Sequence, residues 1–133
     1  MSENGTSVFH ESCFACSSTN AQGLRLEFRN GRDDSTCTAS VGSQFQSYKG
    51  IVHGGIIATL LDAAMVQSLH KFHGRDPLTC RLEVRFLHPV PSNSRVTVQA
   101  RRIGNRGKIV LADAKLLCGG ACYARARGAF TFR

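Results

Sequence analysis

The stretch GGIIATLLDAAMVQSLHK, residues 54–71, decides the fold of this chain. At about 100° per residue its large apolar side chains cover half of a helical wheel, and the other half is mostly small or apolar. A helix that is apolar nearly all round is buried on most sides. Asp62 stands out because it is the single carboxylate of the stretch. Gly74 and Pro77 follow closely and predict where the helix ends.

The segments on either side of this helix alternate apolar and polar residues, which is typical of β-strands. Two of these segments precede the helix and four follow it, at residues 24–30, 35–41, 78–90, 94–103, 108–118 and 121–132. Short glycine-containing turns, at 30–31, 104–107 and 119–120, indicate hairpins and therefore an antiparallel sheet. One buried helix and about six strands predict an α+β hotdog fold, an antiparallel β-sheet wrapped around one long central helix.

The length of 133 residues predicts one domain with a core of its own. We expect a flexible N-terminus over residues 1–12 and a single domain over residues 13–133. The first 12 residues are polar and lack the apolar run of a secretory signal. The longest apolar stretch, Ile56 to Val66, is too short to cross a bilayer. We therefore expect a cytoplasmic protein that does not bind a membrane.

The formal net charge of +8 favours partners that carry phosphates. The basic residues scatter through residues 81–133 and often alternate with apolar ones, which fits solvated strand faces. A nucleic-acid binder needs a basic patch interleaved with stacking aromatic side chains, and the sequence shows no such cluster. Charge alone therefore does not predict nucleic acid as a partner.

The loop before the helix carries a more specific pattern. Gly50-Ile-Val-His53-Gly54-Gly55 is followed by Asp62, nine residues after the histidine. This H-G-G…D element resembles the signature of PaaI-like hotdog acyl-CoA thioesterases. The opening Cys13-Phe-Ala-Cys16, the segments 79–89 and 125–130 also resemble members of that family, so the resemblance spans nearly the whole chain.

Two positions depart from the family pattern. Many members have Asn six residues before the histidine, where this chain has Ser47 preceded by Gln46. Many have Glu after the acid, where this chain has Ala63. The second departure leaves Asp62 as the only carboxylate in the element. The first leaves open whether Gln46 or Ser47 assists the substrate carbonyl or a water.

The resemblance implies a thioester hydrolase with the acyl-CoA ester as its substrate. The N-terminus of the helix offers unpaired N–H groups to a developing oxyanion, so we assign the Gly54 N–H as the main donor and Gly55 as its neighbour. Asp62 is the candidate general base or nucleophile. Gly54 and Asp62 are eight residues apart, about 12 Å along one helix, so one chain cannot bring both to one thioester carbon. The mechanism therefore predicts a homodimer, or a dimer of dimers, with shared sites.

Other residues receive secondary roles. We expect His53 to be structural and to fix the loop, because about 900° of helical rotation separates it from Asp62. In the family a Ser or Thr near position 79 orients the acid or a water, so Thr79 is a candidate for that role. Arg102, Arg106 and Lys108 flank a hairpin and are candidates for binding the coenzyme A phosphates.

No metal or cofactor is expected. Cys13 and Cys16 supply at most half of a zinc site, which needs four ligands. Two alternatives to a thioesterase stay open: a hotdog dehydratase or hydratase that acts on acyl thioesters, and a non-catalytic acyl-CoA-binding module. The longer His-Phe-Pro loop of the dehydratases is missing, and a binding module would not need the carboxylate of Asp62.

Overall fold

The computed structural model describes residues 12–133. The helices and strands of this part are β1 (Arg29–Asn30), β2 (Asp34–Ser40), the short 3-10 turn η2 (Ser43–Phe45), α1 (Gly54–His73), β3 (Pro77–Phe86), β4 (Arg95–Arg106), β5 (Ile109–Cys118) and β6 (Ala121–Phe132). Apart from Ser12, the predicted flexible segment over residues 1–12 lies outside the described residues.

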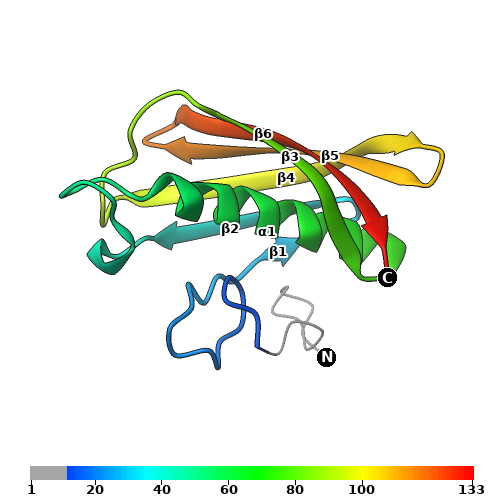
Figure 1. The fold of residues 1–133 in the computed structure, drawn as a ribbon, viewed down its shortest axis with the longest axis horizontal. Coiled ribbons are helices and arrows are strands. Elements are labelled where there is room, and N and C mark those ends of the chain that lie inside the picture. The colour runs from blue at the N-terminus through cyan, green and yellow to red at the C-terminus, as the bar shows by residue number, and fades with distance from the viewer. Residues whose placement is uncertain (1–11) are drawn as a thin grey trace.

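The six strands form one sheet in the order β1-β2-β4-β5-β6-β3, and every neighbouring pair is antiparallel. Helix α1 lies along one face of this sheet (Figure 1). The predicted hotdog architecture is confirmed. Strand β3 follows the helix directly but pairs with β6 at the end of the chain, so its other edge has no partner strand among residues 12–133.

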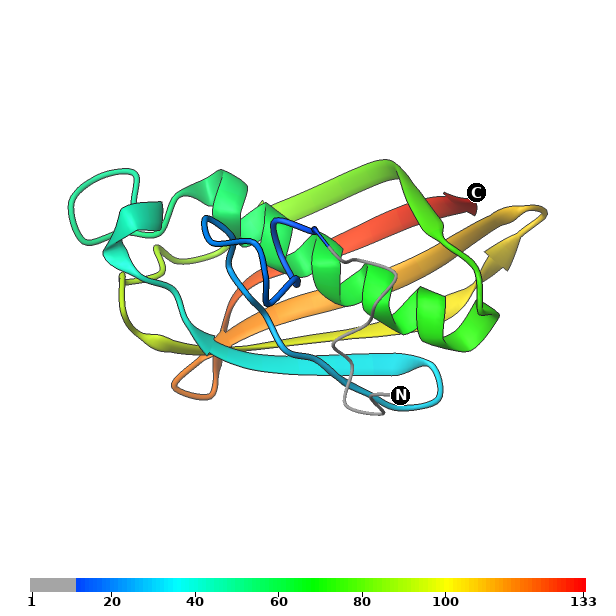
Figure 2. The ribbon, with the colours of Figure 1, turned by 90° about the horizontal axis from the view of Figure 1, so that it is seen from below.

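Helix α1 is buried on two sides, as its sequence predicts. Its sheet side packs on alternate residues of the strands, and the N-terminal loop crosses the side turned away from the sheet (Figure 2). There the buried Gln67 donates from Nε2 to the Cys16 Sγ at 3.7 Å and accepts from Asn30 Nδ2 at 3.1 Å. Gly74 ends the helix in the left-handed conformation, with φ 67°, and its N–H bonds the His70 carbonyl at 2.8 Å.

The core lies between α1 and the sheet. From every second position the sheet contributes small, branched and aromatic side chains, among them Val96, Val98, Ala112, Ala114, Leu116, Ala124 and Phe130. The helix contributes Leu60, Leu61, Met65 and Leu69, each 0–1% exposed. Burying a side chain of this size contributes about 1.5–3 kcal/mol. This burial holds α1, and with it Asp62, in a fixed position against the sheet.

The predicted strand at residues 24–30 is wrong over most of its length, because β1 covers only Arg29–Asn30. The N–H groups of Leu24 and Leu26 bond the carbonyls of Phe14 and Ala15 in the N-terminal loop, at 2.8 and 2.9 Å. Arg25 has a φ of 54°, which a β-strand does not allow. The apolar alternation is real because Leu26 and Phe28 are buried, but it packs a loop against the core.

Two other predicted bounds are also wrong. Strand β4 continues through Arg106, so the predicted turn at residues 104–107 shrinks to the tip of a longer hairpin, where Gly107 has a φ of 61°. Strand β3 ends at Phe86 and does not reach residue 90. The N–H groups of Leu87 and His88 both bond the Tyr123 carbonyl, which takes the chain out of the ladder.

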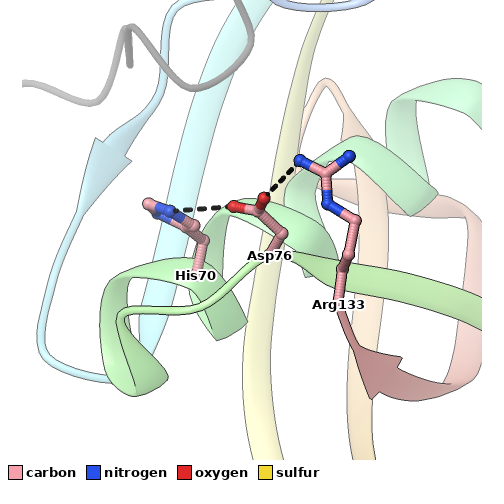
Figure 3. Close-up of polar contacts among 3 residues, drawn as sticks. All are labelled: His70, Asp76 and Arg133. Atoms are coloured by element: carbon pink, nitrogen blue, oxygen red, sulfur yellow. Dashed lines mark hydrogen bonds and ion pairs between the residues drawn. The ribbon is translucent and has the colours of Figure 1, made fainter.

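Ion pairs and a hydrogen bond join the end of α1 to the end of the chain. Figure 3 shows the Asp76 carboxylate between His70 and Arg133. Arg133 Nη2 lies 2.8 Å from Asp76 Oδ2, and His70 Nε2 lies 3.7 Å from Asp76 Oδ1. The Arg133 N–H also donates to the Asp76 carbonyl at 2.9 Å. These contacts fix the start of β3 relative to the end of α1.

No helix formed by residues 12–133 has both the length and the apolar character that a membrane span requires.

Candidate functional site

The N-terminus of α1 is capped by His53. The His53 Nδ1 accepts a hydrogen bond from the Gly55 N–H at 2.8 Å, and the His53 carbonyl accepts from Ile56 and Ile57. Because Nδ1 is the acceptor, the neutral ring carries its proton on Nε2. The His53 N–H is bonded to the Phe45 carbonyl at 2.9 Å, so the residue also anchors the loop before the helix.

This cap leaves the first helical residue as the available donor. The Gly55 N–H is bonded to His53, whereas no hydrogen bond of the Gly54 N–H to any of residues 12–133 is found. A Cβ added to Gly54 would meet only the Phe86 ring, at 3.6 and 3.7 Å, which is ordinary contact. Neither the fit within this chain nor a positive φ therefore requires glycine at position 54. The missing side chain keeps the approach to a free N–H open.

Asp62 lies in the middle of α1 and is half-buried. Its Oδ1 accepts a hydrogen bond from the Thr79 hydroxyl of β3 at 2.7 Å. Burial raises the pKa of the Asp62 carboxyl above its usual range, and the hydrogen bond from Thr79 works in the opposite direction. A carboxylate with a raised pKa is a stronger base than an exposed one, and this is the property that a general base needs near neutral pH.

Thr79 reaches Asp62 because β3 is irregular at this point. Leu82, Val84 and Phe86 pair with inward-facing residues of β6, so even-numbered positions of β3 face α1. In a regular strand the odd-numbered Thr79 would face away from the helix. The register shifts between Thr79 and Arg81, and this bulge turns the Thr79 side chain toward α1. Bulges of this kind re-aim side chains beside functional sites.

Asp62 opens into a small cavity at the edge of the sheet. The cavity has a volume of about 230 Å³ and is lined by Ala58, Thr59, Asp62, Thr79 and Leu82. It is shallow because β3 is the edge strand, and no other strand of residues 12–133 pairs with its outer side. A thioester carbonyl placed here would contact Asp62, but the Gly54 N–H lies about 12 Å along the helix from Asp62.

Gln46 and Ser47 belong to the loop before α1. The Gln46 Oε1 accepts from the Gly50 N–H at 2.9 Å, and the Ser47 N–H donates to the Ile51 carbonyl at 2.8 Å. Both residues are exposed, and among the contacts of residues 12–133 neither side chain bonds Asp62 or Gly54. Their contacts hold the loop in shape, and their part in the chemistry stays a prediction.

The predicted phosphate-binding residues lie at the other end of the helix. Arg102 donates from Nε to the His73 Nε2 at 3.1 Å, and its guanidinium lies 4.5 Å from the centre of the Phe72 ring. This makes Arg102 part of the packing at the C-terminal end of α1. Arg106 and Lys108 are exposed at the tip of the β4–β5 hairpin, which Figure 1 shows beyond that end of the helix.

Metal-binding side chains do not gather in the part of the chain that the structure describes. Among residues 12–133, no group of three or more His, Cys, Asp or Glu side chains lies close enough to bind one. Cys13 and Cys16 both lie in the N-terminal loop. Burial, together with Cys13, raises the pKa of the Cys16 thiol to about 12, which makes it a poor nucleophile and a poor ligand at neutral pH.

Comparison with known proteins supports the fold assignment. Residues 49–114 match the family model of the thioesterase superfamily, and this range includes the His53 cap, α1 and β3. No curated protein matches the chain.

Solved structures match over most of the chain. The crystal structure of a thioesterase superfamily protein is 21% identical with a TM-score of 0.76, over 84% of this chain. This chain spans only 56% of that protein. A hypothetical thioesterase from Streptococcus pneumoniae, solved with coenzyme A, is 17% identical with a TM-score of 0.75, over 81% of this chain and 85% of its own. Thioesterase superfamily member 2 from Mus musculus is 18% identical with a TM-score of 0.73, over 80% and 81%.

At such identities the solved structures establish the fold alone. The finer assignment to the PaaI-like type stays a prediction. The family match over residues 49–114 and the arrangement of one helix on a six-stranded antiparallel sheet agree. The chain therefore belongs to the thioesterase superfamily and has its hotdog fold.

Proposed function

We propose that this protein hydrolyses acyl-CoA thioesters, with Asp62 as the general base or nucleophile and the Gly54 N–H as the oxyanion donor. The observation that carries the proposal is the Asp62 carboxylate itself: it is half-buried on an apolar helix, has a raised pKa and is oriented by Thr79 at 2.7 Å. A buried carboxylate is costly to a fold, so its presence in an open cavity favours a chemical role. Some of the solved structures with this fold were determined with coenzyme A or acetyl-CoA.

The two groups of one active site come from two copies of the chain in this proposal. The unpaired edge of β3 is ten residues long and carries exposed apolar side chains, with Leu78 46% and Phe86 55% exposed. An open edge of this kind is a template for pairing with another strand. Antiparallel pairing of β3 with β3 of a second copy joins the two sheets and sets the two helices side by side in opposite directions. The Gly54 end of one helix then approaches Asp62 of the other.

In the proposed dimer the twofold axis lies near the middle of β3. Thr79 bonds Asp62 and Phe86 lies beside Gly54, so the midpoint between Gly54 and Asp62 falls near residues 82 and 83 of β3. Residues directly opposite each other in an antiparallel pair have their side chains on the same face of the sheet. Neighbouring residues of one strand face opposite sides, so the residue at the axis must be opposite its own copy. An axis at Leu82 sets Arg81 of each copy opposite Glu83 of the other copy, which makes two pairs of opposite charge. An axis at Glu83 sets the two Glu83 side chains opposite each other. Opposite charges favour the axis at Leu82.

The activity is tested by thiol release from short-chain, medium-chain and aromatic acyl-CoAs. Loss of the general base in Asp62→Asn should lower kcat by about 10²–10⁴-fold. Asp113→Asn is the matched control. The Asp113 carboxylate lies on β5, pairs with Arg127 of β6 and is outside the proposed site. No turnover on any ester with retained binding would mean a binding module. Turnover only of hydroxyacyl or enoyl thioesters, without thiol release, would mean a dehydratase or hydratase.

The register is tested by cross-linking. In a Cys80→Ser background, which removes the exposed native thiol of β3, Leu82→Cys should form a disulfide between two copies on mild oxidation. Glu83→Cys is the matched control. It should cross-link far less, because an axis at Leu82 sets Arg81 of the other copy opposite it and leaves the second introduced thiol two residues further along the strand. Efficient cross-linking of Glu83→Cys but not of Leu82→Cys would refute the proposed axis.

A further inference from the structure

The face of the sheet turned away from α1 is hollowed. The hollow is an open groove of about 1080 Å³, lined by five cationic and three anionic side chains from five strands: Arg85, Arg101, Lys115, Arg125, Arg127, Asp34, Glu83 and Asp113. The sheet separates this groove from Asp62, whose carboxylate is bonded on the helix side. The proposed hydrolysis does not use it.

Three cations form a row across this groove. Lys115 of β5 is directly opposite Arg125 of β6, and Arg125 is directly opposite Arg85 of β3. All three side chains are exposed on the same face. Like charges directly opposite each other on neighbouring strands destabilise a sheet. Two successive unfavourable pairs in one row are an arrangement that the fold alone does not require.

In the neighbouring row the charges are arranged so that they stabilise the sheet. There Asp34, Arg101, Asp113, Arg127 and Glu83 lie opposite one another in turn, so the charges alternate across the five strands. Arg127 Nε lies 3.0 Å from Asp113 Oδ1, and Arg81 lies 2.8 Å from Glu83 Oε2.

The carboxylates nearest to the row of cations are thus already engaged. Lys115, Arg125 and Arg85 make no ion pair within residues 12–133. Their charges are available to an anion from outside the chain.

We propose that this row binds an anion that carries two or three linked phosphates. Adjacent strands lie about 4.8 Å apart, so the three cationic groups follow a line about 10 Å long. A short phosphate chain matches this line, and guanidinium groups hold phosphate oxygens by paired charge-assisted bonds. The lining includes no aromatic side chain, so it lacks the stacking platform that a single-stranded nucleic acid needs.

The test is a titration with inorganic tripolyphosphate at low salt, followed by the thermal unfolding midpoint and by calorimetry. Arg125→Gln should weaken binding about fivefold, the factor that one exposed ion pair can supply. Lys115→Gln should do the same, and the triple variant with Arg85→Gln should weaken binding about a hundredfold by the same arithmetic. Arg95→Gln is the matched control: it removes the same charge from an exposed position of β4 outside the groove, and it should bind like the wild type.

A second readout separates binding from a structural role. In phosphate-free buffer Arg125→Gln should raise the unfolding midpoint, because it removes two like-charge contacts, whereas a structural role would make the same change lower the midpoint. A parallel titration with adenosine triphosphate identifies the source of the phosphates. Equal affinity for both ligands means that the phosphate chain alone is recognised, and tighter binding of the nucleotide means that a nucleoside is also held.

Three results would overturn the proposal. One is equal weakening in Arg125→Gln and Arg95→Gln, which would mean nonspecific attraction to a basic protein. Another is tighter binding of an oligoglutamate peptide than of tripolyphosphate, which would mean an acidic protein partner. The third is a change of sedimentation in the triple variant without any anion, which would mean that this face joins copies of the chain.

Discussion

The proposed oxyanion donor can be removed with almost no change to the fold, by the substitution Gly54→Pro. Gly54 is the first residue of α1, where the N–H takes no part in the helical ladder and proline is accepted. The preceding residue must be extended, and His53 already has φ −59° and ψ 135°. The His53 cap uses the Gly55 N–H, so it survives the change. The substitution therefore removes one donor and little else.

The expected loss can be set against a matched control. Removing one preorganised oxyanion donor costs about 2.7–4 kcal/mol in the transition state, so kcat should fall by about 10²–10³. Gly54→Ala keeps the N–H, and its methyl group meets only the Phe86 ring at 3.6 Å. Alanine in a helix is also favoured over glycine by about 0.5–1 kcal/mol. Gly54→Ala should therefore be slightly more stable than the wild type and far more active than Gly54→Pro.

The assay is kcat for thiol release at saturating acyl-CoA, with the unfolding midpoint measured beside it. The midpoint shows that each variant is folded, so a loss of rate reports on the site. If Gly54→Pro is folded and its kcat stays within a few-fold of that of Gly54→Ala, the Gly54 N–H is not the donor. If both variants are equally slow, the open space above Gly54 matters and its N–H does not.

Three further expectations concern pH and stability. Thr79→Val removes the hydrogen bond that lowers the pKa of Asp62, so the acidic limb of the profile of kcat against pH should move to higher pH. An unchanged acidic limb would show that Asp62 is not the titrating group. Burial, Arg102 and Arg75 lower the pKa of His73, so below about pH 6.5 the unfolded state binds more protons than the folded state. The free energy of unfolding should therefore fall as the pH drops below about 6.5. His73→Phe should flatten that part of the curve of unfolding free energy against pH. Asp76→Asn weakens the half-exposed ion pair with Arg133 and should lower the free energy of unfolding in denaturant by less than about 1 kcal/mol. A larger loss would mean that the contacts of Asp76 stabilise the whole of strand β3.

The sequence predicted the central helix well because its signals are local. The apolar residues on both halves of the wheel anticipated a helix covered on two sides, and Gly74 marked its end. The prediction failed where long-range partners decide the structure. Leu24 and Leu26 alternate like strand residues, but their N–H groups donate to the carbonyls of Phe14 and Ala15 in the N-terminal loop. The periodicity of a segment shows which side chains are buried and does not show where its backbone hydrogen bonds go.

The site shows the same division. Asp62 stood out in the sequence as the single carboxylate of an apolar helix, and the resemblance to PaaI-like thioesterases implied its role. Helix geometry then separated it from His53. The bulge between Thr79 and Arg81 has no sequence signal, because the alternation of Leu82, Val84 and Phe86 continues regularly after it. The cap on the Gly55 N–H was equally invisible, although it is what leaves the Gly54 N–H as the free donor. Both features depend on how two segments meet in space.

The central claim is that one active site is built from two chains, and mixed dimers test it most directly. Gly54→Pro and Asp62→Asn subunits, each inactive by itself, are unfolded together, refolded and compared with each variant alone. A mixed dimer has one site with both Gly54 and Asp62 intact and one site that lacks both, so a random mixture should regain about a quarter of the wild-type rate. Isolated mixed dimers with no activity would contradict the account, because one active site would then not combine Gly54 of one chain with Asp62 of the other.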